Sequence, residues 1–226
     1  MNIRAGTFAA VAIASITALG IGGYYAVTGT IHAAYVLINL FLSINLFVCY
    51  WEMCLYWRRH YLKERAAYWR ERTDTHRLSP AARFLAGKVP VRRLASPTLW
   101  TDVWATYAQY DGSYASRRTY GFHADMANGF ATLLPSLVLH ATFTVPFLPA
   151  RIVGIAAAML FWQWWYMTVV YMVSFYVVGR HKRITRGELC LYVWGSNSPW
   201  LLFPLLGLYV SFRLVFDGDY SVLGHG

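Results

Sequence analysis

Five long apolar runs constrain this chain more than any other feature. A helix needs about 20 mostly apolar residues to cross the hydrocarbon core of a bilayer. Composition agrees, since 58% of the 226 residues are hydrophobic and only 13% are charged, about half of the ~25% usual in soluble domains. The sequence therefore predicts an all-α polytopic membrane protein, a five-transmembrane-helix bundle forming one domain over residues 1–226. The predicted spans cover residues 7–27, 32–57, 120–145, 152–178 and 189–216.

The basic residues gather between the predicted spans and orient them. The chain has 20 Lys and Arg against 10 Asp and Glu, and eleven of the basic residues lie between Arg58 and Arg93. With five spans, this segment (58–119), the basic cluster at 180–186 and Arg4 fall on one side. The positive-inside rule therefore predicts a cytoplasmic N-terminus and a C-terminus on the opposite side. The basic segment can attract anionic lipid headgroups, whereas nucleic acid is not an expected partner, because no folded basic module with readout residues is visible.

Local signals predict helices inside the basic segment. The second span continues to about Arg72 in good helix formers, so its helix is expected to project beyond the bilayer. Ser79-Pro80 and Ser96-Pro97 each resemble a helix start with proline at the first helical position.

Four polar side chains stand out among those inside the predicted spans, and each is a functional hypothesis because a polar group in a span costs free energy. They are Glu52, Asp125, Asn128 and Asn197. At 1.5 Å per residue, the two carboxyl groups lie about 5–10 Å below the cytoplasmic interface and Asn197 a little deeper. All four are therefore candidates to line one pocket in the cytoplasmic leaflet. The alternative is that the carboxyl groups reach water or pair with arginines that flank the spans.

Aromatic residues cluster near these positions. Such a cluster can form an aromatic box around a flat apolar ligand or a carbocation, although packing alone explains such clusters more often than not. The candidates for this box are Trp51, Trp162, Trp165, Tyr166 and Trp200. An interfacial belt explains three other tryptophans, Trp57, Trp100 and Trp104.

Metal and cofactor chemistry has little support in the sequence. The three cysteines show no CxxC spacing, and no span carries an HExxH-type pair. Dinucleotide, Walker and nucleophile-elbow fingerprints are also missing from the sequence. We therefore expect neither a bound metal nor a cofactor.

Two blocks of sequence resemble the EXPERA superfamily, whose members include a sterol delta-isomerase and the sigma-2 receptor. Residues 104–114 (WATYAQYDGSY), followed eleven residues later by Asp125, are similar to the family's W-x-E-Y-x-x-x-D-x-R-Y stretch and the acidic residue of the following helix. Residues 197–204 (NSPWLLFP) match the family's N-x-x-W-x-x-x-P. Glu52 matches a glutamate of the second helix. The likeness covers the chain from the second to the fifth span.

The resemblance implies a membrane-embedded cavity for a sterol-like or isoprenoid ligand. In the isomerase, an acid protonates a ring double bond and a base removes a neighbouring proton. Carried over, Glu52 and Asp125 are the acid–base pair, Asn197 orients the carboxyl groups, and Asn128 stands where the isomerase has threonine. Trp200 and the aromatic residues of the fourth span shield the cation.

The chain departs from the isomerase pattern at four positions. Val48 stands where the isomerase has a histidine one turn before its glutamate, and Asp125 is shorter than the family's residue. Thr106 replaces a glutamate and Ser113 an arginine. The missing histidine removes half of a proton relay in the second helix.

Two functions therefore stay open. The first is an isomerase or cyclase that acts on an apolar polycyclic or isoprenoid lipid. The second is a non-catalytic lipid-binding protein or accessory subunit of a larger membrane complex, which the missing histidine favours. The expected partners are membrane lipids, a hydrophobic small-molecule ligand, and a second copy or other membrane subunits. A transporter is less favoured, because five spans without an internal repeat provide no inverted halves.

Overall fold

The computed structural model describes residues 1–72 and 78–225, so residues 73–77 of the predicted basic segment lie outside the described residues. The chain forms two compact units, each described here by itself. Unit 1 comprises Met1–Ala12, Phe47–Phe130 and Phe175–Val193. Unit 2 comprises Ile13–Leu46, Ala131–Ser174 and Trp194–Gly226.

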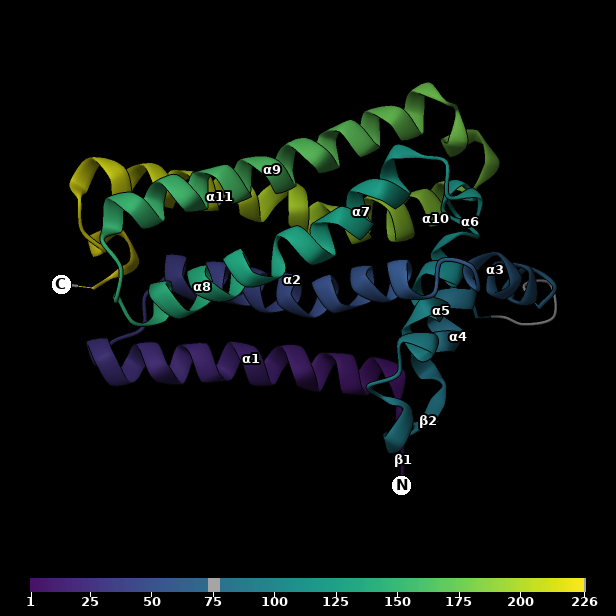
Figure 1. Ribbon diagram of the computed structural model, residues 1–226, viewed down its shortest axis with the longest axis horizontal. Coiled ribbons are helices and arrows are strands. Elements are labelled where there is room, and N and C mark those ends of the chain that lie inside the picture. The colour runs from purple at the N-terminus through teal and green to yellow at the C-terminus, as the bar shows by residue number, and fades with distance from the viewer. Residues whose placement is uncertain (73–77, 226) are drawn as a thin grey trace. The chain divides into compact units, whose positions relative to one another are not determined.

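Within the described residues, four helical stretches are long and apolar enough to cross a membrane, and they are drawn in Figure 1. Three are the single helices α1 (Ala5–Thr28), α2 (Ala33–Trp57) and α9 (Ala150–Val177). The fourth, Arg186–Asp217, contains α10 (Arg186–Glu188), the π-helix η3 (Leu189–Trp194) and α11 (Gly195–Asp217). These stretches make the chain compatible with an all-α, multi-pass membrane protein.

The third predicted span is not one helix. The described structure divides it into α7 (Tyr120–Ala131) and α8 (Leu133–Thr144), drawn as successive helices in Figure 1. Pro135 explains the interruption, because it lacks the N–H that would bond the Ala131 carbonyl group and its ring clashes with that carbonyl. The prediction of an uninterrupted helix over 120–145 is therefore wrong.

The segment after α2 also differs from the prediction. The helix ends at Trp57, and after a turn at 58–61 a separate helix, α3 (Leu62–Arg70), begins. In the turn, the Tyr61 amide bonds to the Arg58 carbonyl at 2.9 Å, a tighter pattern than the α-helix allows. A single helix that projects to Arg72 is therefore wrong.

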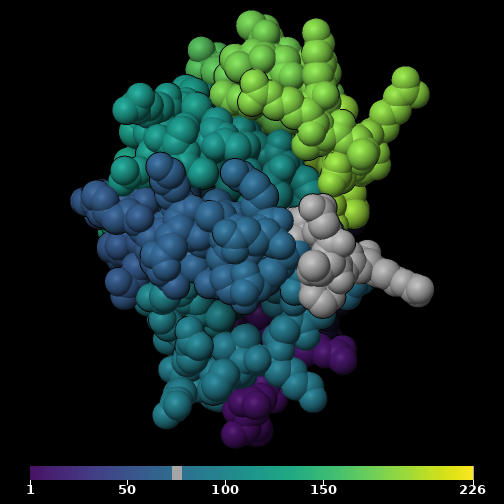
Figure 2. Space-filling model, turned by 90° about the vertical axis from the view of Figure 1, so that its right-hand side faces the viewer, coloured from purple at the N-terminus to yellow at the C-terminus, as the bar shows by residue number. Residues whose placement is uncertain are grey.

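Both predicted proline starts are confirmed. Helix α4 (Pro80–Ala86) begins after Ser79, whose hydroxyl oxygen accepts the Ala82 amide at 3.2 Å, and α5 (Pro97–Tyr107) begins after Ser96. The segment also holds η1 (Val91–Arg93), α6 (Ser113–Ser116) and β2 (Lys88–Pro90), which pairs antiparallel with the N-terminal strand β1 (Asn2–Arg4). This segment covers one face in the space-filling view (Figure 2, blue to teal).

Trp100 is at the centre of unit 1. It is fully buried, and its ring lies 5.6 to 6.1 Å from those of Trp51, Phe47, Phe8 and Phe84. Its indole N–H donates to a backbone carbonyl at 2.6 Å. Trp100 is thus part of the unit's core and not of an interfacial belt. Trp104, only 8% exposed, corrects the same prediction.

Unit 2 packs aromatic side chains between helices that approach closely. Tyr24 stacks on Tyr35 with centroids 4.0 Å apart, and Phe41 contacts the Trp164 ring at 5.4 Å. A Cβ added at Gly154 would stand 2.7 Å from the Ser211 carbonyl oxygen, so only glycine permits this approach of α9 to α11. The short helices η2 (Arg180–Arg183, unit 1) and η4 (Ser221–Leu223, unit 2) complete the fold.

Gly154→Ala should destabilise the protein. The new methyl group would overlap the α11 backbone, which cannot turn away as a side chain can, so we expect a loss of about 1–3 kcal/mol in unfolding free energy. Thermal unfolding in detergent measures the change.

Gly22→Ala is the matched control, because nothing lies within 4 Å of a Cβ added there. Both variants gain helix propensity, so Gly22→Ala should raise the melting temperature or leave it unchanged. Equal melting temperatures for the two variants would contradict the close approach.

Candidate functional site

The candidate site is formed where α7 packs against α2 in unit 1. Glu52 is only 5% exposed, and its Oε2 accepts a hydrogen bond of 2.8 Å from Nδ2 of Asn128. Gly129 makes this approach possible, because a Cβ there would lie 2.7 Å from the Glu52 Cβ and 2.9 Å from the Cys49 carbonyl oxygen. Absence of a side chain at Gly129 therefore places the amide of Asn128 against the carboxyl group.

Asp125 is the second carboxyl group of the site. It lies three residues before Asn128 on α7, so the two side chains share a face of the helix. The Tyr114 hydroxyl group donates to Oδ2 of Asp125. Because Asn128 donates to Glu52 and lies one helical turn from Asp125, α7 brings both carboxyl groups to its contact with α2. The structure thus brings together three of the predicted residues and adds a phenol.

The loop before α7 holds Tyr114 in place. Its ring stacks on Trp104 with centroids 5.5 Å apart and planes at 11°. Asp111, fully buried, accepts hydrogen bonds of 3.0 Å from the Ser113 amide and from the guanidinium group of Arg180. The stacking on Trp104 and the two hydrogen bonds to Asp111 therefore hold the loop so that Tyr114 lies beside Asp125.

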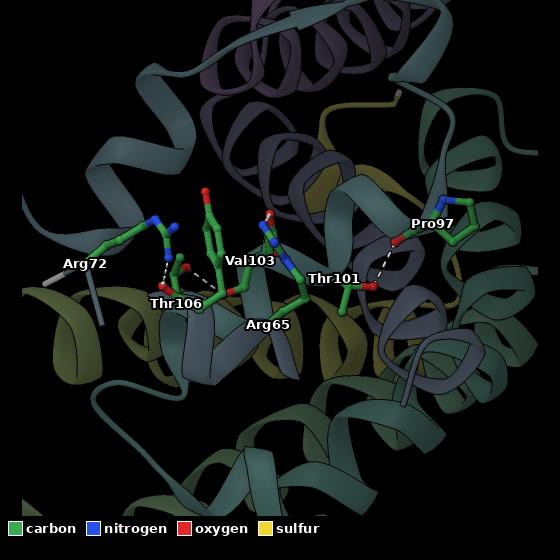
Figure 3. Close-up of polar contacts among 8 residues, drawn as sticks. Arg65, Arg72, Pro97, Thr101, Val103 and Thr106 are labelled. Atoms are coloured by element: carbon green, nitrogen blue, oxygen red, sulfur yellow. Dashed lines mark hydrogen bonds and ion pairs between the residues drawn. The ribbon is translucent and has the colours of Figure 1, made fainter. Parts of the chain in front are cut away.

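A second ion pair ties α3 to α5 and so positions Trp104. Nε and Nη2 of Arg65 donate to the two carboxylate oxygens of Asp102 at 2.7 and 2.6 Å. The hydrogen bonds that Arg65 donates to Asp102 raise the pKa of its guanidinium group. Figure 3 shows the hydroxyl groups of Thr101 and Thr106 turned back onto carbonyl groups of their own helix, each at 2.9 Å. Thr106, which stands where the EXPERA pattern has a glutamate, therefore makes a hydrogen bond within its own helix.

Asn197 and Trp200 belong to unit 2. Asn197 is partly exposed on α11, and its Nδ2 donates to the Ser196 hydroxyl at 3.2 Å. The indole N–H of Trp200 donates to Oδ1 of Asn45 at 3.1 Å, and its ring lies 6.0 Å from Phe41.

The aromatic residues predicted for the box are also divided between the units. Trp162 and Tyr166 are half exposed on α9 and stack on each other, and Trp165 lies 5.5 Å from Trp162. Trp164 is instead buried in the core of unit 2. Trp51 belongs to unit 1, where its carbonyl accepts the Trp104 indole N–H at 2.8 Å.

Sequence reasoning missed a polar series on α2. Asn39, Ser43 and Asn45 are all buried within this helix. Ser43 donates to the Asn39 carbonyl at 2.7 Å, and Asn45 donates to the Ser136 hydroxyl of α8 at 3.0 Å. The sequence does indicate them, because they are polar residues inside an apolar run. The charge of Glu52 is the stronger indication on the same helix.

The arrangement is suited to moving protons. Glu52 and Asp125 can each donate or accept a proton, and Asn128 and Tyr114 hold them in place. Among the described residues, no group of three or more His, Cys, Asp and Glu side chains could hold a metal ion.

Comparisons with protein-family models, curated proteins and solved structures found no match to this chain. The likeness to the EXPERA superfamily stays a prediction from residues 104–114, Asp125 and residues 197–204.

Gly129→Ala should disturb the site directly. The added methyl group would overlap backbone atoms of α2, so α7 must move outward and the hydrogen bond between Asn128 and Glu52 must lengthen. We expect a loss of about 1–3 kcal/mol in unfolding free energy, measured by thermal unfolding in detergent.

Ala127→Val is the control, because it adds bulk to an exposed position of the same helix. It should leave the melting temperature close to that of the unchanged protein. A Gly129→Ala variant as stable as this control would show that α7 does not approach α2 so closely.

Proposed function

We propose that the chain is an intramembrane isomerase that moves a double bond in a sterol-like or isoprenoid lipid by protonation and deprotonation. The observation that carries this proposal is the cluster of Glu52 and Asp125 with their two partners, Asn128 and Tyr114. Two carboxyl groups brought to one helix contact by α2 and α7 can supply the acid and the base that such a reaction needs.

The reaction needs one group of each kind. One carboxyl group donates its proton to a carbon of the double bond, which leaves a carbocation on the neighbouring carbon. The other, as carboxylate, removes a proton from the adjacent carbon, and the electron pair of that C–H bond forms the new double bond. The substrate gains one proton and loses one, so no oxidant or cofactor is required. Exchange of protons with water restores the pair.

The substrate class follows from the surroundings. The rings of Trp51 and Trp104 lie in the same unit as the carboxyl groups, and aromatic faces stabilise a carbocation. The resemblance of residues 104–114 to the EXPERA pattern supports a sterol-like or isoprenoid substrate.

The proposed topology has five spans, the third of them made of α7 and α8 with the interruption between them. Arg4, the segment 58–119 and the cluster at 180–186 then face the cytoplasm. The N-terminus is cytoplasmic and the C-terminus lies on the opposite side.

One observation favours the second candidate, a lipid-binding accessory subunit. Helix α9 exposes apolar side chains at alternating spacings of three and four residues, the spacing by which one helix packs against another. They are Ile152, Ile155, Met159, Trp162 and Tyr166. A partner helix in a larger membrane complex would cover this face.

Deuterium incorporation tests the isomerase without knowledge of the product. The protein, purified with its lipids and supplied with a sterol bearing a ring double bond and with a polyprenol, is incubated in D2O. Protonation at carbon places deuterium in the substrate, which mass spectrometry detects. We expect Glu52→Gln and Asp125→Asn each to slow incorporation by about 100-fold or more, since each removes a proton-transfer group.

Glu64→Gln is the matched control, because it neutralises an exposed carboxyl group on α3. It should retain the full rate. Undiminished incorporation in both site variants would refute the isomerase. A co-purified lipid that takes up no deuterium, even with the unchanged protein, would favour the accessory subunit.

A further inference from the structure

A group of cationic side chains lies at the cytoplasmic end of the proposed site, in unit 1, and takes no part in the proposed chemistry. Arg58 follows α2 directly, and Arg117 and Arg118 precede α7. Nη1 of Arg117 lies 3.1 Å from Nδ1 of His60, so the end of α2 and the link before α7 meet here. Arg58, Arg117 and Arg118 are all exposed and supply the charge; with the exposed His60 beside them they form the arginine cluster.

The arginine cluster has no compensating carboxylate among the described residues. The ion pairs among the described residues join acidic side chains to four other arginines, and none involves the cluster. These arginines are Arg65, Arg72, Arg180 and Arg213. The nearest acidic residue along the chain, Glu64, points its charge into solvent on α3. Like charges therefore gather without neutralisation, an arrangement that an anion stabilises.

Arg117 adopts a costly backbone conformation. Its φ of 55° is the only positive value at a non-glycine residue in the described part of the chain. A left-handed conformation costs such a residue about 1 kcal/mol. This conformation occurs where the Arg117 guanidinium group lies beside His60. Among the described residues, only one of its five N–H groups makes a hydrogen bond. The remaining donors are available to a planar or tetrahedral oxyanion.

An exposed aromatic surface adjoins the cluster. Phe130 lies 5.4 Å from the Tyr56 ring and 6.1 Å from the Trp57 ring, and all three side chains are about two-fifths exposed. Arg59 lies over the Tyr56 ring at 4.4 Å and so caps this surface with a further charge. Tyr and Trp are enriched at the membrane–water interface. Cationic groups therefore stand directly beside an apolar surface at the end of a membrane-spanning helix.

We infer that the arginine cluster binds the phosphate group of an anionic membrane phospholipid, whose first acyl carbons lie on Tyr56, Trp57 and Phe130. The surface suits both parts of such a lipid. The arginines without an ion pair attract the charged headgroup, and the aromatic rings contact the acyl chain. A free phosphate ion would use only the first part. The site is distinct from the carboxyl groups, so the inference stands whether or not the protein is an isomerase.

Native mass spectrometry from nanodiscs tests the inference. With equal parts of phosphatidylcholine and phosphatidylglycerol in the nanodisc, the protein should retain phosphatidylglycerol preferentially. The double variant Arg58→Gln with Arg117→Gly removes two cations, and glycine adopts the left-handed conformation without strain. We expect this variant to lose preferential retention by about tenfold.

The double variant Arg92→Gln with Arg93→Gln is the matched control, because it removes two exposed arginines from η1 of the same basic segment. It should retain phosphatidylglycerol as the unchanged protein does. If Arg58→Gln with Arg117→Gly fails to fold by circular dichroism, Arg118→Gln alone should show the same direction of change.

Three results would overturn the inference. Equal losses in both double variants would show diffuse attraction by the whole segment and not a site. No loss in either would show that the cluster binds no lipid. Displacement of the lipid by inorganic phosphate at constant ionic strength would identify a site for a soluble anion.

Discussion

Polar side chains on an apolar helix must find partners, and this requirement organises much of what surrounds α2. Without water to satisfy them, such groups cost free energy in a membrane, and neighbouring helices must supply the missing donors and acceptors. Asn45 is paired with Ser136 of α8, and Glu52 with Asn128 of α7. The same helix thus carries a structural hydrogen bond in unit 2 and, in unit 1, Glu52 of the candidate acid–base pair. Its polar residues determine where the following helices can lie.

The apolar pattern predicts most of the long helices, because spans of about 20 apolar residues have few alternatives. Ser79-Pro80 and Ser96-Pro97 also predict helix starts correctly, since the proline signal is local. Pro135 is a local signal for the interruption at Ala131. The length of the apolar run around it favours one uninterrupted helix, and the two signals therefore conflict. The burial of Trp100 was not predictable in this way, because it depends on rings distant in the sequence that gather around it.

For the candidate site, sequence reasoning identified residues and could not identify contacts. Glu52 and Asp125 were conspicuous because charge inside an apolar run is costly. Their partnership depends on Gly129, whose role appears only when the distance to α2 is known, since glycine in an apolar helix has no single meaning. Tyr114 lies within a recognisable block, yet its hydrogen bond to Asp125 arises from the loop that Asp111 and Arg180 fix.

The interrupted third segment has a consequence for how the protein is made. Residues 120–144 carry Asp125, Asn128 and Pro135, each of which weakens insertion of an isolated helix into a bilayer. Glu52 and Asn45, the partners of Asn128 and Ser136, lie on α2 and leave the ribosome first. On the proposed five-span topology, assembly therefore has an order, in which α2 stays in the membrane with unsatisfied polar groups until α7 and α8 are made. A truncation before residue 120 would leave those groups exposed to lipid and mark the fragment for quality control.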